Sequence, residues 1–475
     1  MTRKFLILSV FLCVVCSASC GDKKDGGSVA LAERNIERAI VLVENAVSHY
    51  SQDGDAVFSM TYNPFTLKAS ENIVSIWEYT SAIEAVTAVM NSIKDLKASG
   101  RGRLYDEKFS YFASLLESVY SGMDYYKGTF TLTSYTGTAE WSPYGVHRAS
   151  VPGEAKVEGR ENVYDDQMWI IRELINAWRA TGESKYLEKA EYLAAYVLDG
   201  WDCTLDADGV ENGGITWGPG YVSKHSCSNA PMISPLVWLS EIYGGKPDEM
   251  SYGVVDKDGA RSVETAVKAD YYLGMAVKIY EWQKAHLLRE DGVYDDMLGG
   301  PATGDGKVEY ETVNGERYRK NTALMKRIGP AYSYNSGTML SGAADLYSVT
   351  GDESYLGYVK TLTDASFTYF AELDAIVPGL YAYDETRNRP WFNDVLLRGF
   401  IASSECYEGA DVCVKSFQDC LDYAWDNHLE NGTLPADLLS GWDEDNAKND
   451  VNLMFTFAHA AEYATLASYH LGSGK

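Results

Sequence analysis

The chain has 475 residues, of which 46% are apolar and 13% are aromatic, so it has enough material for a large buried core. Its 68 acidic and 41 basic residues give a formal net charge of −27. A charge of this size repels nucleic acid and anionic membrane surfaces, so neither is expected as a partner.

The first residues have the pattern of an export signal. After a basic start, residues 5–15 are apolar but too few to span a bilayer, and small residues precede Cys20. Cys20-Gly21 resembles the lipidation site of bacterial lipoproteins. Because Ser17 stands where leucine is usual, ordinary cleavage without lipid is the alternative. We predict a lipoprotein signal peptide over residues 1–19 and a lipid on Cys20.

A lipid at this position would attach the protein to the outer membrane of the cell envelope, facing either the periplasm or the outside. Residues 20–32 include charged residues and glycines and are predicted to be a flexible tether. Residues 33–475 are predicted to form one domain, and no segment within them is apolar enough to be a transmembrane helix. We expect a monomer whose membrane attachment depends on the lipid alone.

Beyond the tether, apolar residues recur at helical spacing, with no strand-like alternation of comparable strength and no proline- or serine-rich linker. Thr181-Gly182 and Thr350-Gly351 each end one helical pattern just before the next begins, as in a tight turn between two packed helices. The twelve helical patterns cover residues 33–51, 73–97, 106–126, 165–180, 185–198, 229–243, 263–288, 333–349, 353–372, 393–407, 411–428 and 447–471.

Twelve helices in six hairpins predict an all-α fold, an (α/α)6 barrel in which each hairpin buries its apolar face against its neighbours. The connections that enter the even-numbered helices are long, whereas most of the others are short. This alternation places the long connections at one end of the barrel, and loops beyond ~12–15 residues usually have a function. We expect an extended cleft there, near the loop aromatics Trp141, Trp201, Trp217, Tyr221, Tyr294, Tyr332 and Trp391.

Two adjacent acids, Asp165 and Asp166, open the fourth predicted helix at this end. Carboxylates at a helix N-terminus can cap free N–H groups and compensate the helix dipole, but one acid is enough for that role. Neighbouring Cα atoms lie about 3.8 Å apart, so both carboxyl groups can face one cleft at roughly the 5 Å separation that retaining glycosidases use. Crowding would also separate their pKa values, giving an ionised and a protonated acid at neutral pH.

The segment Tyr164-Asp165-Asp166-Gln167-Met168-Trp169 closely resembles the catalytic segment of glycoside hydrolase family 76. The resemblance extends over roughly residues 70 to 470, in the same order and at similar spacing. It implies an (α/α)6 barrel and a retaining endo-α-1,6-mannanase in which Asp165 is the nucleophile and Asp166 the acid/base. The further matching segments are Ala177 to Ala190, Asn212 to Trp217, Lys224, Ser228 to Ala230, Val293 to Asp295 and Tyr334 to Gly337.

Five residues are predicted to bind substrate. Trp217 follows two glycines and can offer a ring face to a sugar, with packing inside its loop as the alternative. Tyr294-Asp295-Asp296 repeats the catalytic tripeptide, but a loop follows it and the resemblance matches only Asp295, which would then bind a sugar hydroxyl or else be a turn acid. The predicted substrate-binding residues are Tyr164, Trp217, Asp295, Tyr334 and Asn335.

Tyr334 and Asn335 open the eighth predicted helix, where asparagine is also a good cap. Lys224, His225 and Asn229 are polar residues of a long connection and are expected to be solvated.

The cysteines show no pattern of a metal site. Cys203 and Cys227 flank the Trp217 loop and could form a disulfide in an oxidising compartment. No CxxC or Cys/His cluster is present, so no metal and no cofactor are expected. Cys406, Cys413 and Cys420 are expected to be buried thiols.

The leading hypothesis is therefore a retaining, endo-acting hydrolase of α-1,6-linked mannan or manno-oligosaccharides, with the catalytic domain over residues 33–475. The alternatives are a transglycosylase or another (α/α)6 glycosidase, such as an unsaturated-uronide hydrolase, and a non-catalytic glycan-binding lipoprotein of the envelope. The intact acid pair favours an enzyme, because a pure binding protein has no need of two crowded carboxylates.

Overall fold

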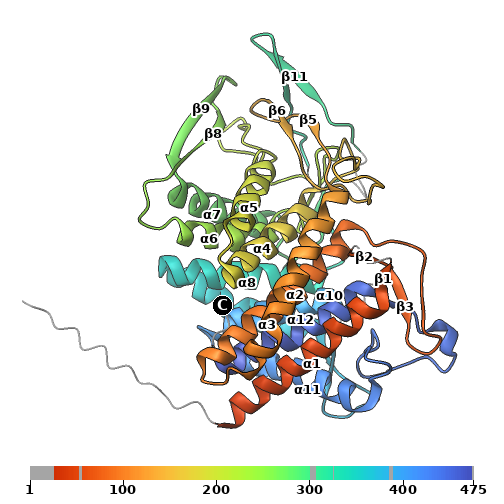
Figure 1. Cartoon of the computed structure of the whole chain (residues 1–475). Helices are drawn as coiled ribbons and strands as arrows, with labels where there is room; N and C mark the ends of the chain where they lie inside the picture. The colour runs from red at the N-terminus through yellow and green to blue at the C-terminus, as the bar shows by residue number, and fades with distance from the viewer. Residues whose placement is uncertain (1–25, 53–55, 300–305, 325, 384–388, 473–475) are drawn as a thin grey trace, which may run out of the picture.

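The computed structural model describes residues 26–52, 56–299, 306–324, 326–383 and 389–472. Within these ranges the chain forms twelve α-helices, and each predicted helical pattern has a counterpart (Figure 1). No helix in the same ranges is long and apolar enough to cross a membrane. The helices are α1 (Gly26–Tyr50), α2 (Ile76–Ala98), α3 (Arg103–Gly122), α4 (Tyr164–Thr181), α5 (Ser184–Leu198), α6 (Ile233–Ile242), α7 (Lys268–Leu287), α8 (Ser333–Thr350), α9 (Glu353–Phe370), α10 (Arg389–Ser404), α11 (Ala410–His428) and α12 (Leu453–Leu471).

The helices pack as two layers of a helical barrel. The even-numbered helices contact one another in order from α2 to α12, and α12 contacts α2. The odd-numbered helices pack against them: α3 on α2, α5 on α4, α7 on α6, α9 on α8, α11 on α10, and α1 on α12 and α2. Most side chains of α4 and α8 are buried, whereas α3 and α9 bury only one face. The even-numbered helices are thus the inner layer.

The two repeated turns have the predicted geometry. Gly182 and Gly351 follow α4 and α8 with φ of 76° and 66°, in the left-handed region that glycine adopts without strain. Their N–H groups donate to the carbonyls of Trp178 (2.7 Å) and Tyr347 (2.8 Å). Each turn leads directly into the next helix.

Short strands and 3₁₀-turns lie in the connections, and the all-α prediction missed them. The predicted helix over residues 263–288 is wrong at its start, where the chain forms a strand up to Val267. Figure 1 shows three hairpins, β5–β6, β8–β9 and β11–β12, projecting from one side of the helices. The strands are β1 (Ser51–Gln52), β2 (Val57–Phe58), β3 (Thr61–Asn63), β4 (Lys68–Ala69), β5 (Phe130–Thr133), β6 (Thr138–Trp141), β7 (Lys224–His225), β8 (Glu249–Val255), β9 (Arg261–Val267), β10 (Met297–Leu298), β11 (Tyr310–Val313), β12 (Glu316–Arg319), β13 (Arg327–Ile328), β14 (Ala371–Leu373), β15 (Tyr381–Tyr383) and β16 (Val451–Asn452). The 3₁₀-turns are η1 (Met123–Tyr126), η2 (Ala230–Met232) and η3 (Asn446–Lys448).

The first helix begins earlier than predicted. Residues 26–32 are the first turns of α1, so the expected tether over residues 20–32 is wrong for this part. Ser28 Oγ donates to the carbonyl of His470 on α12 (2.6 Å), and Ala32 is fully buried. These contacts give the segment a packed helical position. The predicted signal peptide and Cys20 lie outside the described residues.

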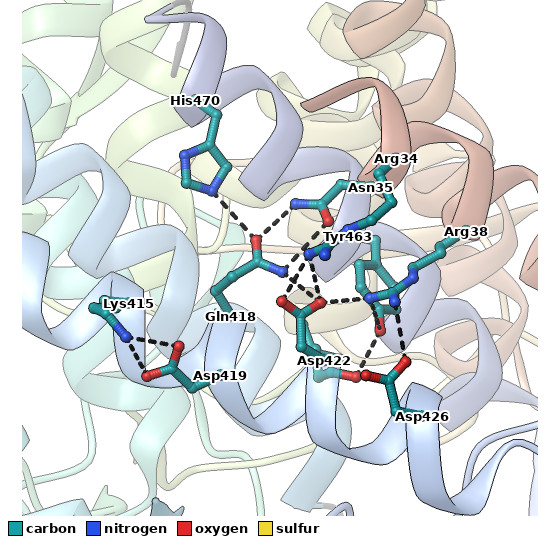
Figure 2. Close-up of polar contacts among 11 residues, drawn as sticks. Arg34, Asn35, Arg38, Lys415, Gln418, Asp419, Asp422, Asp426, Tyr463 and His470 are labelled. Atoms are coloured by element: carbon teal, nitrogen blue, oxygen red, sulfur yellow. Dashed lines mark hydrogen bonds and ion pairs between the residues drawn. The ribbon is translucent and has the colours of Figure 1, made fainter. Parts of the chain in front are cut away.

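A polar cluster fastens α1 to α11 and α12 (Figure 2). One nitrogen of Arg34 donates to both carboxylate oxygens of Asp422, at 2.7 Å each, and Arg38 pairs with the same carboxylate. Arg38 also lies over the ring of Trp425 on α11, 4.9 Å from its centroid. The first and last parts of the chain are therefore joined by charged contacts as well as by apolar packing.

Candidate active site

A cavity of about 920 Å³ opens at the end of the barrel where the inner helices begin. The long connections line it together with the first turns of α2, α4, α8 and α10. This is the end at which the connection lengths predict a cleft. Eight aromatic side chains line the cavity: Trp77, Trp169, Trp217, Tyr221, Tyr332, Tyr334, Trp391 and Phe392.

Asp165 and Asp166 lie in the first turn of α4 and both line the cavity. The N-cap of the helix is Val163, which has no side-chain cap, so neither acid is the capping residue. Asp165 Oδ1 accepts the N–H of Asp166 (3.1 Å), and Asp165 Oδ2 accepts the indole N–H of Trp217 (3.2 Å). Each oxygen of Asp165 therefore accepts a hydrogen bond that stabilises its ionised form.

The environment separates the pKa values of the two acids. Burial raises the pKa of Asp165 to about 6, while hydrogen bonds from Cys227, Trp217 and the backbone oppose the rise. Burial, the neighbouring charge of Asp165 and that of Glu78 raise the pKa of Asp166 well above its usual value. Asp165 therefore ionises before Asp166 as the pH rises, and this order gives the ionised and the protonated acid that a two-carboxylate hydrolysis uses.

Trp217 is fixed in place by its own loop. Its ring stacks on His225, with centroids 4.9 Å apart and an interplanar angle of 19°. Its carbonyl accepts the N–H of Tyr164 (2.8 Å), which ties the loop to the start of α4. Gly214 has φ of 74° and lies so close to Trp282 that a Cβ there would come within 2.4 Å of the indole. Only glycine fits this approach, which explains the glycine pair before Trp217.

A third acid faces the pair, and it is Asp296 rather than Asp295. Asp296 lines the cavity, and burial, together with the charge of Asp165, raises its pKa to about 7. Asp295 is not part of the cavity lining; its carboxylate lies 3.8 Å from Arg289 and 3.7 Å from Arg327. The cavity position that the sequence led us to expect for Asp295 is therefore occupied by its neighbour.

The other predicted substrate-binding residues divide into two groups. Trp217 and Tyr334 line the cavity. Tyr164 does not: its side chain is buried against Tyr196, with ring centroids 5.1 Å apart, so it is a core residue. Asn335 is fully buried and does not line the cavity.

Three residues expected to be solvated are buried instead. Lys224 Nζ forms an ion pair with Asp202 (3.0 Å) inside the loop. The Asn229 side chain bonds to both the N–H and the carbonyl of Ile215 (2.7 and 2.9 Å). His225 lies in the cavity, and burial lowers its pKa to about 4, so it is neutral. These polar groups hold the Trp217 loop, which has little regular secondary structure of its own.

Some cavity residues were not predicted. Trp169 lies four residues after Asp165 on the same face of α4, so helical spacing alone could have found it. The sequence around Trp77 and Cys227 gives no comparable indication that they line the cavity. Cys203 and Cys227, for which the sequence left a disulfide open, are free thiols; Cys227 lines the cavity, whereas Cys203 does not.

A helical barrel whose aromatic cavity holds paired acids with separated pKa values has the features of a glycoside hydrolase. The family model of glycosyl hydrolase family 76 matches residues 152–244 and 260–433 of the chain. The protein belongs to this family and is a glycoside hydrolase. No curated protein matches the sequence.

Solved structures show the same fold. A family 76 glycoside hydrolase (mannosidase) from Bacteroides thetaiotaomicron is 20% identical, with a TM-score of 0.66 over 91% of this chain and 98% of that one. The GH76A α-1,6-mannanase from Salegentibacter is 18% identical, with a TM-score of 0.57 over 92% of this chain and 99% of that one. An inactive variant of the latter, 17% identical, with a TM-score of 0.57 and the same coverage, is in complex with α-1,6-mannotriose.

Proposed function

We propose that the protein is a retaining endo-α-1,6-mannanase built on an (α/α)6 barrel of six helical hairpins. The catalytic part of this proposal rests on the separated pKa values of the two acids. The pKa of Asp165 is about 6, and that of Asp166 is raised well above its usual value. The linkage is supported by the family and by the similar mannanase that binds α-1,6-mannotriose. The barrel is supported by the ring of contacts among the even-numbered helices.

In the first step, the ionised Asp165 attacks the anomeric carbon and Asp166 donates its proton to the leaving glycosidic oxygen. The indole N–H of Trp217 occupies one lone pair of Asp165 Oδ2 and fixes the plane of the carboxylate. Burial strengthens the electrostatic effect of each of these groups on the transition state.

In the second step, Asp166 takes a proton from water, and the water attacks the covalent intermediate on Asp165. Once Asp165 is esterified it carries no charge, so one of the causes that raised the pKa of Asp166 is removed. The same residue therefore serves as acid and then as base. The two displacements keep the α configuration.

The charge of the cavity argues against an unsaturated-uronide hydrolase. Among the described residues, the lining contains four carboxyl groups, those of Glu161, Asp165, Asp166 and Asp296, and one arginine, Arg160. An anionic sugar would meet net repulsion there, whereas a neutral mannose chain would not. Transglycosylation uses the same covalent intermediate, so only the acceptor, water or sugar, separates it from hydrolysis.

The test combines product analysis with two variants. Parent enzyme incubated with α-1,6-mannan should release oligosaccharides of mixed length that retain the α configuration. Asp165→Asn should be inactive even on a substrate with a good leaving group. Asp166→Asn should retain glycosylation of that substrate and gain turnover from azide, which needs no general base. Full mannan hydrolysis by either variant would rule out the assignment.

We also propose that Cys20 is lipidated and holds the enzyme on the outer membrane. The support is the apolar segment followed by Cys20-Gly21. Cys20→Ala should move the protein from the membrane fraction to the soluble fraction, and continued membrane attachment of this variant would disprove the anchor.

A further inference from the structure

A second cavity, of about 410 Å³, lies beside the barrel and shares no lining residue with the catalytic cavity. We call it the hairpin groove. It is bounded by β6, the end of α5, the hairpin β8–β9 and the first turns of α7. Figure 1 shows these elements grouped on the side where the three hairpins project. Its volume is within the range of ordinary small-ligand sites.

The lining of the hairpin groove combines rings with carboxylates. Trp141, Trp201, Tyr252 and Tyr271 supply four aromatic side chains, and the acids are Asp199, Glu211 and Asp270. Lys278 is the one cation that the described part of the chain contributes to the lining, and its ammonium group already pairs with Glu211 (2.8 Å). Rings that can cover the apolar face of a pyranose, next to acceptors for its hydroxyls, suit a neutral sugar; an anionic ligand would be repelled.

The groove has a fixed shape. Arg261 on β9 donates to the carbonyl of Tyr135 (3.1 Å) and pairs with Glu311 on β11 (2.6 Å), so it joins all three hairpins. Gly253 on β8 lies so close to Thr136 that a Cβ would come within 2.4 Å of that side chain. These contacts hold β8–β9 against the other two hairpins, which fixes one wall of the groove and preorganises the space for a ligand.

One connection serves both cavities. The chain between α5 and α6 contributes Trp201 and Glu211 to the hairpin groove and then Trp217 and His225 to the catalytic cavity. Between these residues the connection is fixed internally, because the buried Asp202 pairs with Lys224 (3.0 Å). The two cavities are therefore linked by one internally fixed connection.

We propose that the hairpin groove is a second carbohydrate-binding site, which holds a neutral mannose chain outside the catalytic cavity. The identity of this ligand rests on the proposed function. The groove increases the affinity of the enzyme for long chains, since a polymer bound at two places is retained better than one bound at the catalytic cavity alone. A short oligosaccharide reaches only the catalytic cavity and gains nothing from the groove.

Gly274 allows the groove to be filled without removing a contact. It lies on α7, lines the groove, and a Cβ built there meets nothing within 4 Å. Gly274→Phe should place a ring in the groove, and Gly274→Ala leaves the groove open. Gly357→Phe is the matched control, because Gly357 is an equally open, exposed helical glycine on α9, away from both cavities.

The four proteins are compared by kcat/KM on polymeric α-1,6-mannan and on α-1,6-mannotetraose. Retention by mannan in affinity electrophoresis is measured in the Asp165→Asn background. For Gly274→Phe we expect about a 3- to 10-fold loss on the polymer, the size of one lost sugar–ring contact, and unchanged kinetics on the tetraose. The other two variants should behave as the parent does.

Equal polymer kinetics and equal retention for Gly274→Phe and Gly357→Phe would overturn the second site. A parent enzyme that cleaves neither substrate would instead refute the proposed function. In that case retention by mannan still tests the second binding site. Weaker retention of Gly274→Phe than of the parent supports the site, and equal or absent retention of both proteins refutes it.

Discussion

Replacing Trp217 by phenylalanine removes the hydrogen bond to Asp165 and leaves the ring. The indole N–H lies 3.2 Å from Asp165 Oδ2 and favours the ionised carboxylate. A hydrogen bond to a charged group contributes about 1.5–3 kcal/mol, and one pKa unit corresponds to about 1.4 kcal/mol. Trp217→Phe should therefore raise the pKa of Asp165 by about one to two units, from about 6 to roughly 7–8.

The pH profile of kcat/KM reports this change. In the proposed mechanism the nucleophile Asp165 must be ionised, so activity falls as the pH drops through its pKa. A higher pKa moves this acid limb of the profile to higher pH. At pH 6 about half of Asp165 is ionised in the parent, and roughly 1–10% in the variant, which gives about a 5- to 50-fold loss of kcat/KM. Above pH 8 the loss should become much smaller.

Trp391→Phe is the matched control. Trp391 lines the same cavity, but its indole N–H donates to Glu84 (3.1 Å) and not to either catalytic acid. It should lower activity without moving the acid limb. If Trp217→Phe leaves the limb in place, or if Trp391→Phe shifts it equally, the indole does not set the pKa of Asp165.

Four further variants test stability. Burial raises the folded-state pKa of Asp165 from its usual 3.8 to about 6, so ionisation of this group destabilises the fold once the pH exceeds 4. At pH 7, Asp165→Asn should therefore have a free energy of unfolding in urea up to about 3 kcal/mol higher than that of the parent. At pH 4 the two proteins should unfold at the same urea concentration. Asp422→Asn weakens the pairing with Arg34 on α1 and should lower the free energy of unfolding in urea by about 1–3 kcal/mol (Figure 2). Its control, Asp419→Asn, loses only the exposed partner Lys415 on its own helix and should lower it by less than about 1 kcal/mol. Gly214→Ala should lower both activity and the melting temperature, because a methyl group there overlaps the Trp282 indole.

Helical spacing predicted the existence of every α-helix in the described ranges, because each is long enough for its buried stripe to recur several times. The strands could not be predicted from the spacing of apolar residues. Several, such as β7 and β10, have two residues, too few for any alternation. Even the seven-residue β9 runs directly into α7, and its apolar residues match the helical pattern that follows.

The candidate site was predictable in part. The acid pair and Trp217 stand next to helix and glycine signals that are local in sequence. Tyr164 and Asp295 show the limit of such reasoning, because each adjoins a residue that does line the cavity. Which of two neighbours faces the cavity depends on how the segment is held: β10, which follows Asp296, pairs with β7 and β13 from distant parts of the chain. No local pattern contains that pairing.

The difference in pKa between the two acids also depends on contacts from distant parts of the chain. Both lie in the first turn of one helix and share its dipole, so nothing in the segment distinguishes them. The difference comes from Trp217, 52 residues away, and from Cys227, whose hydrogen bonds favour the ionised form of Asp165. Asp166 receives no comparable donor, and burial together with the charges of Asp165 and Glu78 raises its pKa. The long connection before α6 therefore lowers the pKa of Asp165 on α4 relative to that of Asp166. Changes in this connection should alter the pH dependence of the enzyme before they alter its fold.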